Sequence, residues 1–188
     1  MKKMIMIAAI MLMSIGAFAQ SNVYIKPMVG GTLATFVGDV ENNKMKIGLV
    51  VVGELGYNLS ENMALTAGVL YSMQGTGVKD HDENINMDYL NVPILFNYYV
   101  APGLAIKAGV QPGFLLSSKW DDEDMKDMNE TFDLSIPLGI SYEISDFVID
   151  ARYNLGVTNV LKENKGWTWD GKARNSVIML TLGYKIPF

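Results

Sequence analysis

Cysteine is absent from this chain of 188 residues. The protein therefore has no disulfide framework, no thiolate metal site and no cysteine for a lipoprotein anchor. Beyond the first residues, the sequence also lacks the uncharged apolar run of about 20 residues that a membrane-spanning helix needs. Its only histidine, His81, lies between two aspartates. We interpret His81 as a solvated loop residue rather than a base or metal ligand, and we expect no metal and no cofactor.

Positive charge is also scarce. The chain has 15 lysines and arginines against 20 aspartates and glutamates, a formal net charge of −5. This balance argues against nucleic acid as a partner. The densest acidic run, residues 121–124 within the long segment 117–130, lacks EF-hand spacing, and we interpret it as a solvated loop.

The amino terminus has the pattern of a secretory signal peptide. Lys2 and Lys3 precede an apolar run over residues 4–13, and Ala17-Phe18-Ala19 is a small-x-small cleavage site. The apolar run is too short to span a membrane as a helix. We expect a signal peptide over residues 1–19 and one domain over residues 20–188. Removal of the signal peptide takes away two lysines and changes the formal net charge from −5 to −7.

Alternation of period two is what the chain has in abundance. Every second residue from Phe188 back to Ile178 is large and apolar, and the residues between are smaller, polar or mixed. Such alternation indicates a strand with a different environment on each face. Seven other segments alternate in a similar way. The predicted strands cover residues 22–36, 45–58, 63–74, 89–100, 104–116, 131–144, 147–157 and 175–188.

The connections between these strands alternate in length. Short turns are predicted at residues 59–62, 101–103 and 145–146, and the other connections are long and polar. Short periplasmic turns with longer external loops are typical of outer-membrane barrels. The predicted fold is therefore all-β, an eight-stranded antiparallel up-and-down transmembrane β-barrel. Its expected partners are outer-membrane lipid and, during insertion, the barrel-assembly machinery. A soluble lipocalin-like binding barrel is the alternative fold, and it would turn its apolar face inward.

The two predicted faces differ in charge. The apolar face carries no charged residue on any predicted strand, as lipid requires. Six aromatic residues near the short-turn end are predicted to form an interfacial girdle: Tyr57, Tyr98, Tyr142, Phe147, Tyr184 and Phe188. Nine charged residues on the inner face are predicted to form a structural ionic network: Lys26, Lys46, Glu54, Lys107, Asp133, Glu143, Asp150, Arg152 and Lys185. Because the interior of an eight-stranded barrel is just wide enough for its own side chains, we expect a filled lumen, with a narrow ion or small-solute channel as the alternative.

Three segments carry a family resemblance. Residues 89–100 read YLNVPILFNYYV, residues 151–160 read ARYNLGVTNV, and the chain ends in LGYKIPF. Together they resemble the PorT-like outer-membrane β-barrel family of Bacteroidetes, also labelled porin family or outer membrane protein beta-barrel domain. The resemblance implies an outer-membrane location and no catalytic residue, because the family pattern is structural. The positions that carry this pattern are Pro93, Arg152, Tyr153, Leu155 and Gly156.

The function favoured by the sequence is a non-enzymatic role in the outer membrane that is structural, adhesive or accessory to an envelope or secretion complex. The founding member of the PorT-like family is tied to secretion across the outer membrane. A lipid A-modifying enzyme is an alternative, but the deacylases of that class use a His–Ser pair on a strand, and no histidine lies on a predicted strand here. Trp167 and Trp169 of the last long connection are either a contact point for a partner or glycan, or rest on the barrel rim.

Overall fold

The computed structural model describes residues 22–39, 43–78, 84–120, 123–161 and 172–188. The predicted signal peptide, His81, Trp167 and Trp169 lie outside these residues. In the described part, no helix has the length and apolar character needed to cross a membrane.

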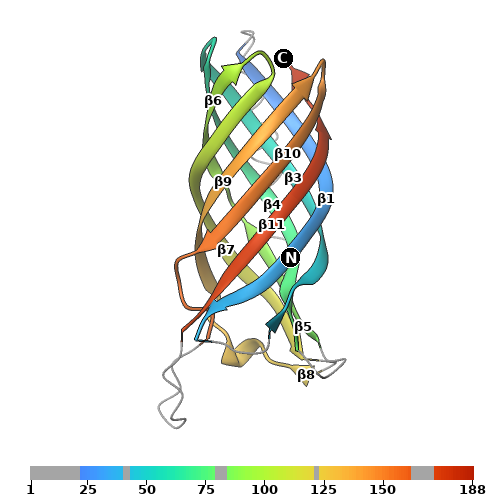
Figure 1. Cartoon of the computed structure of the whole chain (residues 1–188), viewed down its shortest axis with the longest axis vertical. Helices are drawn as coiled ribbons and strands as arrows, with labels where there is room; N and C mark the ends of the chain where they lie inside the picture. Colours follow the sequence, from blue (N-terminus) through green and yellow to red (C-terminus); the bar gives the residue numbers. More distant parts are fainter. Residues whose placement is uncertain (1–21, 40–42, 79–83, 121–122, 162–171) are drawn as a thin grey trace.

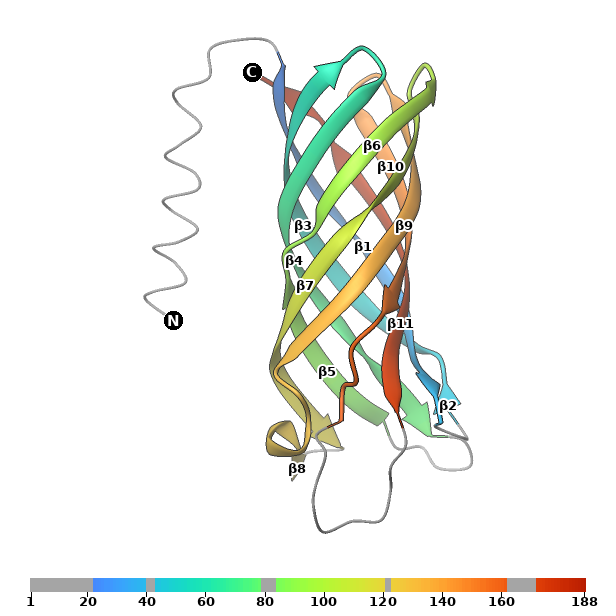
Figure 2. The ribbon, with the colours of Figure 1, turned by 90° about the vertical axis from the view of Figure 1, so that its left-hand side faces the viewer.

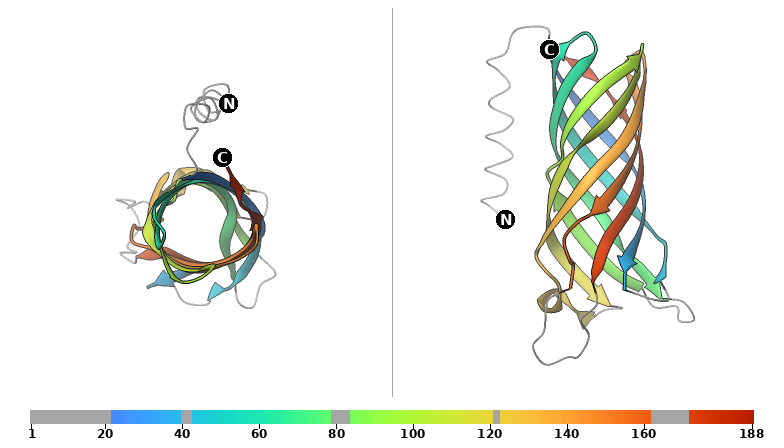
Figure 3. Two further views of the ribbon diagram at one scale, coloured as in Figure 1. Left: turned by 90° about the horizontal axis from the view of Figure 1, so that it is seen from above. Right: turned by 60° about the vertical axis from the view of Figure 1, so that its left-hand side comes forward.

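The long strands form a closed antiparallel barrel (Figures 1 and 3). Each long strand pairs with the next one along the chain, with residues 84–101 counted as one interrupted strand, and β1 (Val23–Gly38) also pairs with β11 (Ala173–Tyr184), from Met28 opposite Gly183 to Gly38 opposite Ala173. This last pairing closes the ring, so the barrel has no free edge, and the prediction of an up-and-down β-barrel is confirmed. Eight strands make up the wall of the barrel, and we call each of them a stave; two of the staves are interrupted and carry two labels. The staves are β1 (Val23–Gly38), β3 (Lys46–Ser60), β4 (Met63–Val78), β5 (Asn84–Asn91) with β6 (Ile94–Ala101), β7 (Leu104–Trp120), β9 (Phe132–Ile144), β10 (Phe147–Gly156), and β11 (Ala173–Tyr184) with β12 (Ile186–Pro187).

Several strands extend further than the alternation predicted. Residues 75–88 were expected to be a loop, but β4 continues to Val78 and β5 starts at Asn84. Likewise β7 continues to Trp120, inside the expected loop 117–130. Backbone pairing does not depend on side-chain polarity, so strands continue into polar sequence where the apolar face ends.

Short elements lie at the end of the barrel where β4 and β7 extend into polar sequence (Figure 2). The two-residue strand β2 (Asn43–Lys44) pairs with β4. The strand β8 (Glu123–Asp124) pairs with β7 and is followed by the 3-10 turn η2 (Lys126–Met128). The predicted acidic loop therefore contains regular structure. We call this the loop end and the opposite end the short-turn end.

One stave is interrupted in its middle, between β5 and β6. Pro93 has no backbone N–H to give to the ladder, and pairing resumes at Ile94. Hydrogen bonds still connect the interrupted backbone to both neighbouring strands: the Val92 N–H donates to the Pro112 carbonyl at 2.8 Å, and the Gly68 N–H donates to the Pro93 carbonyl at 3.0 Å.

The apolar residues face outward. On β3 the outward residues Ile47, Leu49 and Val51 are 55–78% exposed, whereas the inward residues Val50 and Val52 are buried. All six residues of the predicted aromatic girdle are exposed, and Phe147 and Tyr184 meet edge to face with centroids 5.3 Å apart. A soluble lipocalin-like barrel would have the opposite orientation, so this arrangement contradicts that alternative.

Candidate functional site: the filled lumen

Five of the nine predicted inner charges meet in one buried group, which we call the charge cluster. It consists of Lys26 of β1, Glu54 of β3, Lys107 of β7, and Asp150 and Arg152 of β10. Each of these residues is at most 4% exposed. Alternation turns all five inward, and the barrel wall excludes water around them.

Arg152 is the centre of the charge cluster. Its Nε donates to Asp150 Oδ1 at 2.6 Å and its Nη2 donates to Asp150 Oδ2 at 3.1 Å and also to Glu54 Oε1. Lys107 Nζ donates to Asp150 Oδ2 and lies 3.9 Å from Glu54 Oε2, and Lys26 Nζ lies 3.7 Å from the same Glu54 oxygen. Buried charges held by several partners in this way are costly to leave unpaired.

The contacts of the cluster cross the lumen. Lys26 and Glu54 are register partners on adjacent strands, but Glu54 and Arg152 come from staves that are not neighbours in the ring. Gly139 of β9 lies opposite both Lys107 and Arg152 in register, and an added Cβ there would be 2.6 Å from the Ala151 carbonyl oxygen and 3.0 Å from Arg152 Cγ. The glycine therefore lets β10 approach closely and leaves room for the Arg152 side chain.

The other predicted inner charges lie apart from the charge cluster. At the short-turn end Lys185 Nζ pairs with Glu143 Oε2 at 2.7 Å, and the Tyr99 hydroxyl donates to Glu143 Oε1 at 2.9 Å. Lys185 Nζ also lies 4.5 Å from the centre of the Tyr24 ring. The single network predicted from the sequence is thus divided by the structure.

Asp133 and Lys46 have no ion pair within the described residues. Asp133 accepts hydrogen bonds from Thr158 Oγ1 at 2.6 Å and from Asn175 Nδ2 at 3.2 Å. Lys46 Nζ donates to the Gln74 carbonyl at 3.1 Å. Both residues lie toward the loop end, where neutral polar groups satisfy them.

Two apolar layers inside the lumen were not predicted. The middle layer is made of Met28, Val50, Val52, Leu70 and Met179. The loop-end layer is made of Phe36, Met87, Tyr89, Leu115, Val160 and Ala173. Apolar residues on the otherwise polar inner face were the available signal, but alternation alone does not tell which of them meet across the barrel.

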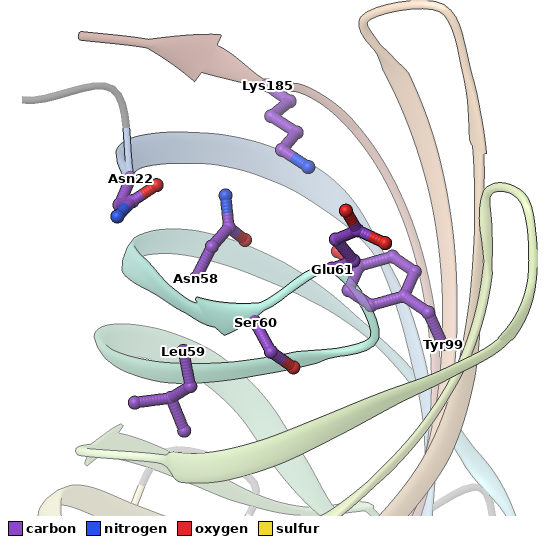
Figure 4. A pocket seen from close by; sticks show the side chains of 7 residues that line it. All are labelled: Asn22, Asn58, Leu59, Ser60, Glu61, Tyr99 and Lys185. Carbon is purple, nitrogen blue, oxygen red and sulfur yellow. The ribbon is translucent and has the colours of Figure 1, made fainter.

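A pocket of about 400 Å³ opens at the short-turn end. Figure 4 shows Lys185, Tyr99 and Glu61 pointing toward one another there, with Asn22 and Asn58 beside them. Two residues of its lining, Lys185 and Tyr99, contact the buried side of this end: both bind Glu143, and Lys185 Nζ lies over the Tyr24 ring. Within the described residues, no group of three or more histidine, cysteine, aspartate or glutamate side chains is placed to hold a metal.

Solved structures of similar fold include two bacterial surface proteins. The attachment invasion locus protein Ail of Yersinia pestis aligns with a TM-score of 0.52 and 14% identity over 89% of this chain and 100% of its own. The Neisserial surface protein A aligns with a TM-score of 0.56 and 13% identity over 88% of this chain and 97% of its own. At these identities the likeness concerns the fold. No curated protein matches the chain.

The sequence itself matches a family model. The model described as outer membrane protein beta-barrel domain covers residues 18–162, which is most of the chain and includes seven of the eight staves, from β1 to β10. The outward apolar face and the closed ring agree with that match. The chain therefore belongs to the outer membrane protein beta-barrel domain family.

Proposed function

We propose that this outer-membrane protein is a closed, non-enzymatic barrel of the PorT-like kind that acts as an accessory to an envelope or secretion complex. The filled lumen is the observation that carries the proposal. The charge cluster joins opposite walls, and two apolar layers lie between it and the loop end. A water-filled path needs a continuous polar lining, so this packing favours a structural role over transport.

An adhesive role is the second candidate, and the fold likeness to Ail is what favours it. Ail is the attachment invasion locus protein of its organism, and one of its solved structures contains the heparin analogue sucrose octasulfate. The net negative charge of the present chain opposes binding to a polyanion of that kind. We therefore rank the accessory role first.

Planar-bilayer recording tests the closed lumen. Purified protein, shown to be folded by a mobility shift on boiling, is added to a bilayer beside a porin reconstituted in the same way. We expect no unitary conductance steps from this protein, because side chains fill its interior. Reproducible steps of constant size would contradict the closed barrel and favour the narrow channel.

A further inference from the structure

The charge cluster is not electrically balanced. Lys26, Lys107 and Arg152 bring three positive charges, and Glu54 and Asp150 bring two negative ones. All five side chains are 0–1% exposed. One positive charge is therefore left over in a part of the lumen from which bulk water is excluded, and a buried charge without a partner is costly.

Hydrogen-bonding capacity in the charge cluster is also left unused. Arg152 Nη1 is buried and has no hydrogen-bond partner among the described residues. Glu54 Oε2 accepts no hydrogen bond, although the ammonium groups of Lys26 and Lys107 are 3.7 Å and 3.9 Å away. Most buried polar groups in proteins have a partner, so an orphaned guanidinium nitrogen next to an excess positive charge indicates a missing acceptor.

The surroundings of the cluster do not supply the missing negative charge. Toward the short-turn end, Lys185 and Glu143 neutralise each other. Toward the loop end lies the middle apolar layer, whose residues carry no charge. Lys26 Nζ lies 5.3 Å from the centre of the Tyr24 ring, whose π face attracts a cation but carries no net charge.

We propose that the charge cluster binds one small monovalent anion of the halide class beside Arg152 Nη1. The anion accepts the hydrogen bond that this nitrogen does not give to the protein and balances the charge that Lys26 adds. It enters from the short-turn end, where the pocket of Figure 4 opens, because the two apolar layers close the other end. The inference is independent of the proposed accessory role, since it concerns only the lumen.

Bromide diffraction gives the direct test. Crystals of the wild-type protein grown in bromide are measured at the bromine absorption edge. We expect one anomalous peak inside the barrel in contact with the Arg152 guanidinium. Absence of a peak there, in crystals that show bromide elsewhere, would overturn the proposal. A water molecule beside Arg152 Nη1, or loss of a proton from a lysine, would then explain the unpartnered nitrogen and the excess charge.

A stability measurement gives the test in solution. Wild-type protein folded in detergent is unfolded thermally in sodium chloride and in sodium gluconate at equal ionic strength, because gluconate is too large for the cluster. We expect the midpoint to be higher in chloride by a few degrees and the shift to saturate with chloride concentration. Equal midpoints in the two salts would contradict a bound halide.

Two lysine variants distinguish an anion bound in the charge cluster from a general effect of chloride on stability. Lys26→Met leaves two cations and two anions, so we expect its midpoint to be the same in chloride and gluconate. Lys46→Met removes another inner lysine that lies outside the cluster, and it should keep the wild-type chloride shift. If both variants keep the shift, the cluster is not its source. If Lys26→Met does not fold, the bromide experiment on the wild type still decides.

Discussion

At the scale of single residues, Arg152 joins the two buried carboxylates of the charge cluster, Glu54 and Asp150. The Lys185–Glu143 pair is a useful contrast, because its side chains are 21% and 10% exposed and water reaches them. Ion pairs are thus present both in the buried charge cluster and at the more exposed short-turn end.

Replacing Arg152 with methionine should destabilise the barrel strongly. Arg152→Met removes the hydrogen bonds that the guanidinium gives to Asp150 and Glu54 inside the lumen, and breaking a buried pair in this way costs about 3–5 kcal/mol. Urea unfolding in lipid vesicles, followed by tryptophan fluorescence and by the mobility shift on boiling, measures the loss. Lys185→Met is the matched control and should cost clearly less. Equal losses for the two variants would contradict a special role for the cluster.

At the scale of elements, glycines on β1 and β3 have opposite roles. Gly30 faces the lumen side of β1, and a Cβ added there would collide with the backbone of β11 at Leu180. Gly53 faces outward from β3, and an added Cβ would have no atom within 4 Å. Close approach of two staves, rather than backbone flexibility, explains glycine at position 30.

The two glycines predict opposite results for alanine. Gly30→Ala must push β1 away from β11, and overpacking of this kind costs about 1–3 kcal/mol. Gly53→Ala should be neutral or slightly stabilising, because it only reduces the freedom of the unfolded chain. The urea midpoints of the folded proteins compare them directly. A stable Gly30→Ala protein would show that the seam between β1 and β11 adapts more easily than its backbone spacing indicates.

The outward face of β9 predicts a dependence on depth. Leu138 lies in the middle of β9 and Ile144 at its short-turn end, and both are about half exposed, at 50% and 53%. In a bilayer, Leu138→Arg places a charge near the midplane at a cost of about 2–4 kcal/mol, whereas a charge near the interface costs about 0–1 kcal/mol. Ile144→Arg should therefore fold nearly as well as wild type in vesicles. Similar losses at both positions would contradict the transmembrane placement of β9.

At the scale of the whole molecule, the two ends of the barrel differ in construction. Three tight turns form the short-turn end, and the longer connections with β2, β8 and η2 form the loop end (Figure 2). Outer-membrane barrels place short turns in the periplasm and longer loops outside the cell. We therefore expect the loop end to be the surface that meets an external partner.

Labelling of single cysteines tests this orientation, and the absence of native cysteine makes it clean. Met128→Cys at the loop end should react with a membrane-impermeant maleimide in intact cells, because Met128 is exposed. Glu61→Cys in a short turn should react only after the outer membrane is permeabilised. The reverse pattern would mean that the barrel is inserted the other way round.

The sequence by itself determined the architecture of this protein. Alternation of period two is a local property of each strand, so the inward and outward faces could be assigned residue by residue, and the number of strands followed from the turns between them. The inward position of Arg152 and the outward position of Phe147 were predicted in this way. The ends of β4 and β7 were not predicted. Beyond the apolar band these strands continue into polar sequence, which has no alternation to identify it as strand.

Only the tertiary structure decided which inner residues meet. Lys107 and Glu54 lie on staves that are not neighbours, and their contact depends on the tilt and stagger of the whole ring, which no single strand encodes. The same geometry separates Asp133 and Lys46 from the charge cluster and brings Phe36 and Leu115 into the same loop-end layer. Contacts across a lumen are set by closure of the barrel, and closure is a property of all its strands together.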